Sequence, residues 1–258
     1  MLKDFTKEKF DIIIQAGQSN SEGYGFGLTD NPYTPDGRVW SMNENDTISL
    51  AVEKVAFNGI QANFALPFAR EYIRAGYLAE GRSILILRAA VGGTGFLDNR
   101  WKLTDDLYLH MMEMIRTALS LNPENRLIAL IWHQGETDAI CHATYDQHYH
   151  HLNTLLNSVR DTFEVPELPF IAGDFVPRWK EANIQIAAPV SDAMRAVCTD
   201  CGHGGFAESH GLGSNAQDVD VHPLGWGNTD DIHFSRRSIY ELGLRYFREY
   251  ARIVGPSV

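Results

Sequence analysis

Short apolar runs alternate with longer segments of helical period along the whole chain. The runs are rich in β-branched or aromatic residues, which is typical of strands that are buried on both faces. A parallel sheet covered by helices on both faces produces this alternation, so the sequence predicts an α/β fold. The strands are expected at Asp11–Ala16, Arg38–Ser41, Ser83–Arg88, Leu127–His133 and Pro169–Gly173.

The segments between these strands carry the start and stop signals of helices. The last helix is expected to begin after an N-cap at Ser235 and to end at Gly255-Pro256, because apolar residues between them recur every three or four positions. The other helices are expected at Phe64–Ala75, Asp105–Leu121, His142–Phe163 and Asn183–Cys198. No repeat or linker divides the chain, so we expect a single domain over residues 1–258.

Two stretches rich in glycine, Gly23–Pro35 and Gly202–Asp231, are predicted to be loops. Structureless stretches of this length in a compact domain are usually functional. We expect both to rim the site.

The net charge of −11 argues against a nucleic acid or an anionic membrane as the main partner. The N-terminal residues show no apolar signal segment, and the three isoleucines that follow are too few to span a bilayer. Three cysteines are few and odd in number, as is typical of a reduced compartment. A cytoplasmic protein is therefore expected, although a secreted protein trimmed of its signal peptide would look the same. The oligomeric state does not follow from the sequence.

Ser19 directly follows the first predicted strand, in the segment Gly17-Gln18-Ser19-Asn20-Ser21. A serine on the turn that leaves a buried strand and opens a helix is well placed to act as a nucleophile. The alternative is a helix cap, because Ser19 and Glu22 have the spacing of a capping box. Glycines at 23, 25 and 27 follow where a capped helix would continue with apolar residues, which favours the nucleophile.

Asp230 and His233 supply the second part of the expected chemistry. A serine hydroxyl needs a base, and an imidazole needs a carboxylate that fixes its tautomer. Asp231 is less suited to that task than Asp230, since adjacent side chains diverge. A loop histidine beside a capping aspartate is the alternative, but the pair lies just before the last core helix of a chain that already holds a candidate serine.

The third part is an oxyanion hole, for which three donors are candidates: the Ser19 N–H, the N–H of Gly92 or Gly93, and the side-chain amide of Gln134. The alternatives are a tight turn for the glycines and ordinary buried polar residues for Gln134 and Glu136. All of these groups follow predicted strands, and the carboxyl ends of parallel strands meet at one edge of a sheet. That shared position favours a site.

Four segments resemble, in the right order, the sequence blocks of the SGNH hydrolase superfamily, in its sialate O-acetylesterase-like and acetylxylan esterase-like branch. They are Gly17-Gln18-Ser19-Asn20, Gly92-Gly93-Thr94, Trp132-His133-Gln134-Gly135-Glu136-x-Asp138-Ala139 and Asp230-x-x-His233-Phe234. Together they span nearly the whole chain, from about Asp11 to Tyr250.

The resemblance implies a three-layer α/β/α sandwich with a five-stranded parallel sheet and a metal-independent deacetylation of sugars. It implies Ser19 as nucleophile, His233 as base and Asp230 as its orienting carboxylate. Gly92 or Gly93 and Gln134 would complete the oxyanion hole, with Glu136 in support. Gln134 stands where the superfamily has asparagine, a change that is common in this branch.

Other residues allow weaker interpretations. The run Cys198-x-x-Cys201-x-His203 suggests zinc, with Cys141 or His210 as a fourth ligand, but a structural zinc site shows four ligands at compact spacing. We therefore expect no metal and no cofactor. An aromatic face suits the C–H side of a sugar ring, although core packing is an equal alternative for the candidate tryptophans, Trp101, Trp179 and Trp226. Arg88 and Arg178 could meet a substrate carboxylate.

The sequence thus predicts a serine esterase that removes O-acetyl groups from a carbohydrate, either an acetylated xylo-oligosaccharide or sialic acid. Two alternatives stay open: an esterase or thioesterase acting on a non-sugar acyl ester, and a catalytically silent carbohydrate-binding protein.

Overall fold

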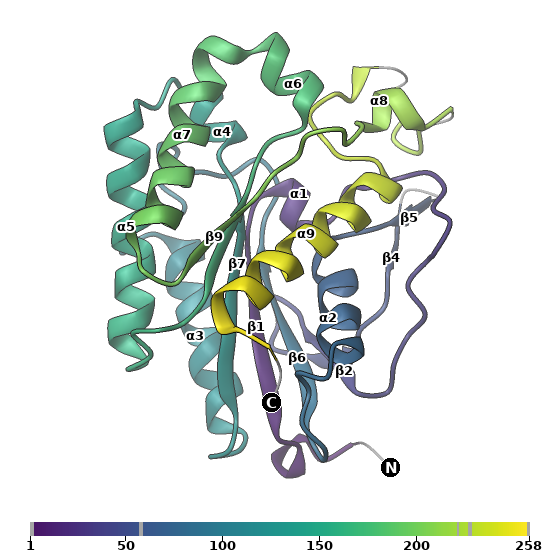
Figure 1. The fold of residues 1–258 in the computed structure, drawn as a ribbon, viewed down its shortest axis with the longest axis vertical. Helices are drawn as coiled ribbons and strands as arrows, with labels where there is room; N and C mark the ends of the chain where they lie inside the picture. Colours follow the sequence, from purple (N-terminus) through teal and green to yellow (C-terminus); the bar gives the residue numbers. More distant parts are fainter. Residues whose placement is uncertain (1–2, 57–58, 221, 227–228, 257–258) are drawn as a thin grey trace.

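A mostly parallel sheet runs through the middle of the molecule (Figure 1). The computed structural model describes residues 3–56, 59–220, 222–226 and 229–256. Within them the sheet has seven strands in the order β3-β2-β6-β1-β7-β8-β9, and only β3 runs antiparallel to its neighbour. The strands are β1 (Phe10–Gly17), β2 (Val39–Met42), β3 (Ile48–Leu50), β6 (Ser83–Ala90), β7 (Arg126–His133), β8 (Phe170–Gly173) and β9 (Gly204–Ala207). A separate hairpin pairs β4 (Lys54–Ala56) with β5 (Gly59–Gln61).

Helices cover both faces of this sheet. On the face toward the viewer in Figure 1, α2 (Ala65–Arg74) packs against α9 (Arg236–Val254). The other face is covered by α3 (Asp106–Ser120), α5 (Tyr145–Thr162) and α7 (Ile184–Asp200). The short elements are η1 (Phe5–Lys7), α1 (Ser19–Glu22), α4 (Glu136–Ile140), α6 (Pro177–Ala182) and α8 (Asn215–Asp218). The predicted three-layer α/β/α architecture is confirmed. None of the described helices combines the length and the apolar character that a membrane crossing requires.

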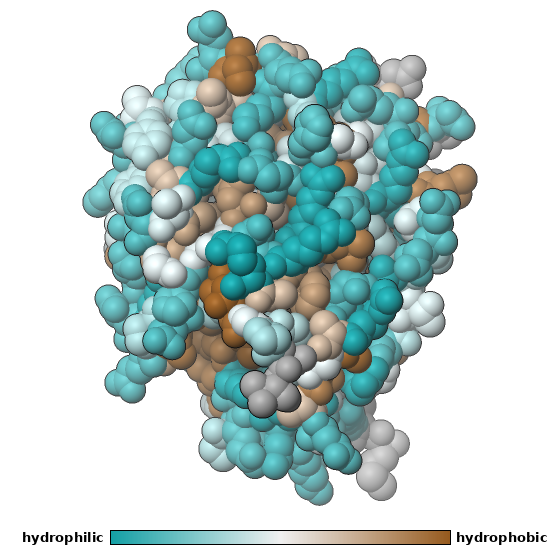
Figure 2. Space-filling model, viewed as in Figure 1, coloured by the Kyte–Doolittle hydropathy of each residue, from teal (hydrophilic) through white to brown (hydrophobic). Residues whose placement is uncertain are grey.

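The amphipathic pattern of α9 fixes that helix on the sheet. The predicted stripe packs inward, with Ile239, Leu242, Tyr246 and Tyr250 buried and Tyr246 stacked on the ring of Phe64. Burial of each such side chain contributes about 1.5–3 kcal/mol. Figure 2 shows hydrophilic residues along the outer face of the same helix. Its sequence period therefore gives both its position and its orientation.

The prediction of five strands was wrong by two. β3 is an edge strand of only three residues, and its side chains are half-buried or exposed. β9 lies within the stretch Gly202–Asp231, which was predicted to be a loop. The prediction was wrong here because the first two residues of β9, Gly204 and Gly205, are typical of a turn. A Cβ at Gly204 would lie 1.9 Å from the Cys198 carbonyl oxygen, and one at Gly205 would lie 2.7 Å from Glu249 Cβ. These glycines let α7 and α9 pack closely on the sheet edge.

The helix predicted over His142–Phe163 begins three residues later. His142 has a positive φ of 58°, and Thr144 forms a capping box with Gln147, so α5 starts at Tyr145. The short helix α4 precedes it, directly after β7. This break places the residues that follow β7 at the carboxyl edge of the sheet.

The ends of three central strands meet at that edge. Gly17 of β1 lies opposite Ala90 of β6 and His133 of β7. Gly17 has a φ of 129°, and a Cβ there would lie 2.1 Å from the His133 carbonyl oxygen. Only glycine allows β1 to turn into α1 this close to β7. The turn delivers the next residues to the top of the sheet.

Candidate active site

Ser19 is the first residue of α1, and its hydroxyl faces a histidine from the opposite end of the chain. The distance from Ser19 Oγ to His233 Nε2 is 2.9 Å. The N-cap of α1 is Gln18, and Ser19 makes no capping hydrogen bond. The Glu22 carboxylate accepts a hydrogen bond from the Gly92 N–H instead, at 2.9 Å. The capping-box alternative is therefore wrong.

Asp230 completes a chain of hydrogen bonds to Ser19. Its Oδ1 lies 2.7 Å from His233 Nδ1, and its Oδ2 accepts from Asn215 Nδ2 at 2.8 Å. Burial alone raises the pKa of Asp230, but hydrogen bonds from His233, Asn215 and His222 lower it below the ordinary value of 3.8. The carboxylate is thus ionised across the neutral range. Asp231 points elsewhere and pairs with Arg178 Nε at 3.0 Å.

A second histidine, His222, holds the other oxygen of the same carboxylate. Its Nε2 lies 2.8 Å from Asp230 Oδ2, and its Nδ1 accepts from the Leu224 N–H at 3.2 Å. Because Nδ1 is an acceptor, the proton is on Nε2, which donates to Asp230. His222 and Asn215 were missed in the sequence, since no spacing rule links either to the Asp230 block; only the folded loop brings them together.

Aromatic rings from the two glycine-rich stretches pack on His233. Tyr24 stacks on its imidazole with ring centroids 4.9 Å apart, and Trp226 stacks at 5.8 Å. Trp226 is 43% exposed, whereas Trp101 and Trp179 are buried in the core. Of the three candidate tryptophans, Trp226 alone therefore lies at this site.

The glycine loop after β6 lies beside Ser19. Gly92 and Gly93 both line the cavity around the serine. The Gly92 N–H is engaged by Glu22, and Gly93 has a left-handed φ of 70°. Gln134 is fully buried, does not line the cavity, and donates from Nε2 to Asp138 Oδ2 at 3.0 Å. The predicted donation from Gln134 to an oxyanion would require this side chain to change partners.

Asp138 binds the backbone of the same loop through hydrogen bonds. Its carboxylate accepts from the N–H groups of Phe96 and Leu97, at 3.1 and 2.8 Å, and from Gln134. Burial raises the pKa of Asp138, but its interaction with His148 and these backbone donors lower it overall. The carboxylate thus ties the loop after β6 to α4.

Asn20 connects the serine segment to the histidine segment. Its Nδ2 donates to the Ile232 carbonyl at 3.0 Å and to Glu136 Oε1 at 2.8 Å, while its Oδ1 accepts from the Phe234 N–H at 3.1 Å. Glu136 is fully buried; burial raises its pKa, but His133 and Asn20 stabilise the carboxylate and lower it overall. His133 Nε2 lies 3.7 Å from Glu136, too far for a hydrogen bond. Glu136, which was predicted to support the site, thus contacts α1 through Asn20.

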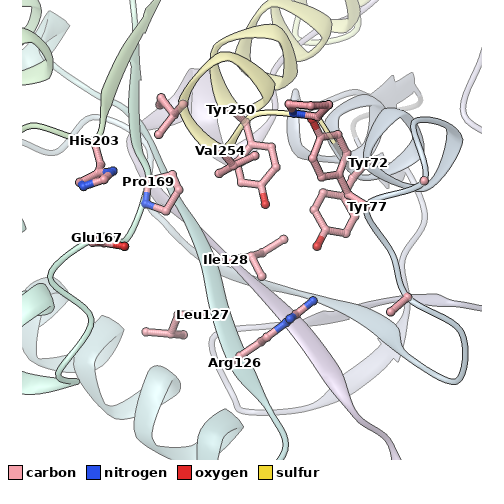
Figure 3. Close-up of a pocket in the computed structure, with 14 residues that line it drawn as sticks. Tyr72, Tyr77, Arg126, Leu127, Ile128, Glu167, Pro169, His203, Tyr250 and Val254 are labelled. Atoms are coloured by element: carbon pink, nitrogen blue, oxygen red, sulfur yellow. The ribbon is translucent and has the colours of Figure 1, made fainter. Parts of the chain in front are cut away.

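The cavity around Ser19 has a volume of about 450 Å³. A larger cavity of about 720 Å³ lies between the lower end of α9 and the amino ends of the strands (Figure 3). Three of its polar side chains are already paired: Tyr72 donates to Asp11 at 2.7 Å, Arg126 donates to Asp11 at 2.7 Å, and Tyr77 donates to the Gly255 carbonyl. It holds none of the Ser19, His233 and Asp230 side chains.

The cysteines of the suggested zinc run are free thiols. Burial raises the pKa of Cys198 to about 12, and Cys201 Sγ contacts the Cys198 carbonyl at 3.7 Å. In the part of the chain that the structure describes, no three His, Cys, Asp or Glu side chains gather as metal ligands would.

Comparison with known proteins shows relatives over the length of the chain. The model of one family, described as "Carbohydrate esterase, sialic acid-specific acetylesterase", matches residues 9–252. A protein of Escherichia coli (strain K12), named probable 9-O-acetyl-N-acetylneuraminic acid deacetylase, is 24% identical over 228 residues, with 66% of this chain and 68% of that protein covered.

Solved structures share the fold at low identity. The crystal structure of NanS matches with a TM-score of 0.80 and 19% identity, covering 95% of this chain and 98% of that one. A protein from Arabidopsis thaliana matches with a TM-score of 0.69 and 17% identity, covering 95% and 98%. A carbohydrate acetylesterase from Xanthomonas citri matches with a TM-score of 0.59 and 16% identity, covering 94% of this chain and 56% of that one.

Proposed function

This chain belongs to the carbohydrate esterase family of sialic acid-specific acetylesterases, and we propose that Ser19, His233 and Asp230 remove O-acetyl groups from its sugar substrate through an acetyl-serine intermediate. Membership of this family makes the protein a carboxylic ester hydrolase. The assignment of the three residues rests on one observation, the unbroken hydrogen-bond chain from Asp230 through His233 to Ser19 Oγ, with distances of 2.7 and 2.9 Å.

The proposed reaction has two halves. His233 Nε2 takes the Ser19 proton as Oγ attacks the acetyl carbonyl carbon, and the tetrahedral intermediate then expels the sugar hydroxyl, which receives the proton from His233. Water, deprotonated by His233, attacks the acetyl-serine carbonyl carbon. The second tetrahedral intermediate then breaks its bond to Ser19 Oγ, which takes back the proton from His233, and acetic acid leaves and ionises to acetate. Asp230 stays ionised throughout, because its lowered pKa keeps it charged, and it stabilises the imidazolium that forms twice per cycle.

The developing oxyanion needs donors that are not already engaged. We assign this role to the N–H groups of Ser19 and Gly93, because the Gly92 N–H is bound by Glu22 and the Gln134 amide faces Asp138. Each well-aligned donor contributes roughly 3 kcal/mol to the transition state. Gly92 and Gln134 would join the oxyanion hole only after leaving these partners.

An O-acetylated sialic acid is the proposed substrate, supported by the family description and by the name of the Escherichia coli relative. Acetate release tests it with O-acetyl sialic acid, acetylated xylo-oligosaccharide, 4-nitrophenyl acetate and an acetyl thioester side by side. We expect the highest kcat/KM on O-acetyl sialic acid. A preference for the thioester would favour a non-sugar substrate, and a folded protein that releases no acetate from any of them would favour the silent binder.

His222 is proposed as a positioning residue that acts through Asp230. His222→Ala is expected to lower kcat about 10- to 100-fold, the effect of losing one hydrogen bond to a buried charge, with little change in KM. Without that donor more of the carboxylate charge faces His233, so the imidazolium is favoured and the acid limb of the kcat/KM profile moves to higher pH. His222→Gln keeps a donor and should restore much of the rate.

The exposed His210 offers a matched control, since His210→Gln removes an imidazole that is not among the hydrogen-bond partners of Asp230. A loss of thermal stability in His222→Ala without a shift of the pH profile would assign His222 a structural role only.

A cytoplasmic location remains a prediction. The three cysteines are free thiols, which agrees with a reducing compartment.

A further inference from the structure

A second cavity of about 480 Å³ adjoins the one that holds Ser19. The two share Glu22 and Val91 in their linings, so they lie side by side at these residues. The second cavity lies at the carboxyl ends of β1, β2 and β6, next to α3. Its remaining polar lining comprises Gln15, Asn43, Glu44, Lys54, Arg88 and His110.

Arg88 is a half-buried cation without an anionic partner. Its single hydrogen bond runs from Nη2 to the Glu22 carbonyl at 3.1 Å, and among the described residues no carboxylate lies within 4 Å of it. Burial lowers the pKa of Arg88, and the more distant charges of Glu22 and Glu44 oppose that effect. By contrast, Arg82 and Arg236 each reach a carboxylate at 2.7 Å. A buried charge is costly unless it is paired.

Unpartnered polar atoms lie beside Arg88. Gln15 is 1% exposed and pairs in register with Arg88 across β1 and β6, so both side chains lie on the same face of the sheet. Gln15 Oε1 and His110 Nε2 have no hydrogen-bond partner among the described residues. Buried polar atoms normally find partners, so this wall of the cavity fits a ligand that offers an N–H or O–H group next to an anion.

The carboxylates of the lining do not occupy Arg88. Glu22 Oε2 accepts from the Gly92 N–H, and its Oε1 lies 3.7 Å from Lys54 Nζ. Glu44 is exposed, so water screens its charge. In this lining Arg88 is therefore the half-buried cation that is left to bind an added anion, and Lys54 lies exposed at the rim.

We propose that this cavity selects acidic sugars: Arg88 and Lys54 bind the sugar carboxylate, and Gln15 Oε1 accepts a hydrogen bond from an adjacent amide or hydroxyl group, while the acetyl ester lies at Ser19. This inference rests on the proposed function, because the acetyl group must be held at Ser19 for the rest of the sugar to reach Arg88. It adds the residues that distinguish a carboxylated sugar from a neutral one.

The test compares O-acetyl sialic acid with its methyl ester, which keeps every group except the charge. Wild type is expected to show a higher kcat/KM for the free acid than for the ester. Arg88→Gln should reduce this acid-to-ester ratio about 10- to 100-fold, mainly through the KM of the acid, because a charged hydrogen-bonded pair is lost. Lys54 is exposed and its substitution should be tolerated. Lys54→Gln should reduce the ratio only a few-fold, because an ion pair with the sugar carboxylate contributes less when water surrounds it.

Arg116→Gln is the matched control, since Arg116 lies on the outer face of α3 and should leave the ratio at its wild-type value. A wild-type ratio near one, or an Arg88→Gln variant that loses activity on acid and ester alike, would overturn the inference. Failure of the proposed function is distinct, because wild type would then prefer the acetyl thioester or release no acetate even from 4-nitrophenyl acetate.

Discussion

Ser19→Ala is expected to lower kcat/KM for acetate release by about 10⁴-fold or more, with the fold intact. The substitution removes the only atom that would form the acetyl-enzyme, and the remaining groups can then act only by binding and polarising the ester. Ser19 is the first residue of a four-residue helix and makes no cap, so alanine costs little stability there. Steady-state acetate release on O-acetyl sialic acid measures the effect.

Ser21 supplies a close control for that experiment. It lies two residues away on α1, is fully buried, and its hydroxyl has no hydrogen-bond partner in the described part of the chain. Ser21→Ala should keep nearly the full rate and should still react with a fluorophosphonate probe, whereas Ser19→Ala should not react. Turnover by Ser19→Ala within tenfold of wild type would exclude the serine mechanism.

Asp230→Asn is expected to cost about 10⁴-fold in kcat. The three groups that hold Asp230 are all donors, from His233, Asn215 and His222. The asparagine amide offers these three donors only one acceptor oxygen, and its NH₂ group would face another donor. His233 would therefore lose its partner or adopt the wrong tautomer. Asp231→Asn removes the charge from the partly exposed pair with Arg178, while the amide oxygen can still accept from Ser214 Oγ, and the variant should stay within a few-fold of wild type.

The same variant tests the pKa of Asp230 through stability. The folded-state pKa lies below the ordinary 3.8, so the ionised carboxylate contributes stability above about pH 3.8 that is lost as the pH falls through the folded-state value. The difference in unfolding free energy between wild type and Asp230→Asn should therefore be constant near neutrality and shrink on acidification below pH 3.8. A difference that grows on acidification would contradict the lowered pKa.

The residues at strand ends were the predictable part of this molecule. Ser19, Gly92 and Gln134 each follow an apolar run that the sequence marks as a strand, and parallel strands place such residues at one edge whatever the details of packing. Asp230 and His233 could be paired because they lie three positions apart in one short segment.

Partners that depend on loop conformation could not be predicted in this way. His222 and Asn215 reach Asp230 only because the chain between β9 and α9 folds back on itself, and nothing in its glycine-rich sequence sets that path. β9 was missed for a related reason: its glycines are required by the close approach of Cys198 on α7 and Glu249 on α9, which the apolar pattern of the segment does not show. Gln134 was expected to line the cavity. Its side-chain amide instead donates a hydrogen bond to the carboxylate of Asp138, one helical turn later.

Asn20 has a consequence for how the site responds to thermal motion. One side chain, next to Ser19 in the chain, holds the backbone on both sides of His233, at Ile232 and Phe234, and is itself anchored to the buried Glu136. The serine and the histidine come from opposite ends of the chain, yet they are braced as one rigid body. The distance between the two reacting atoms is therefore held by a side chain that lies outside the hydrogen-bond chain joining them.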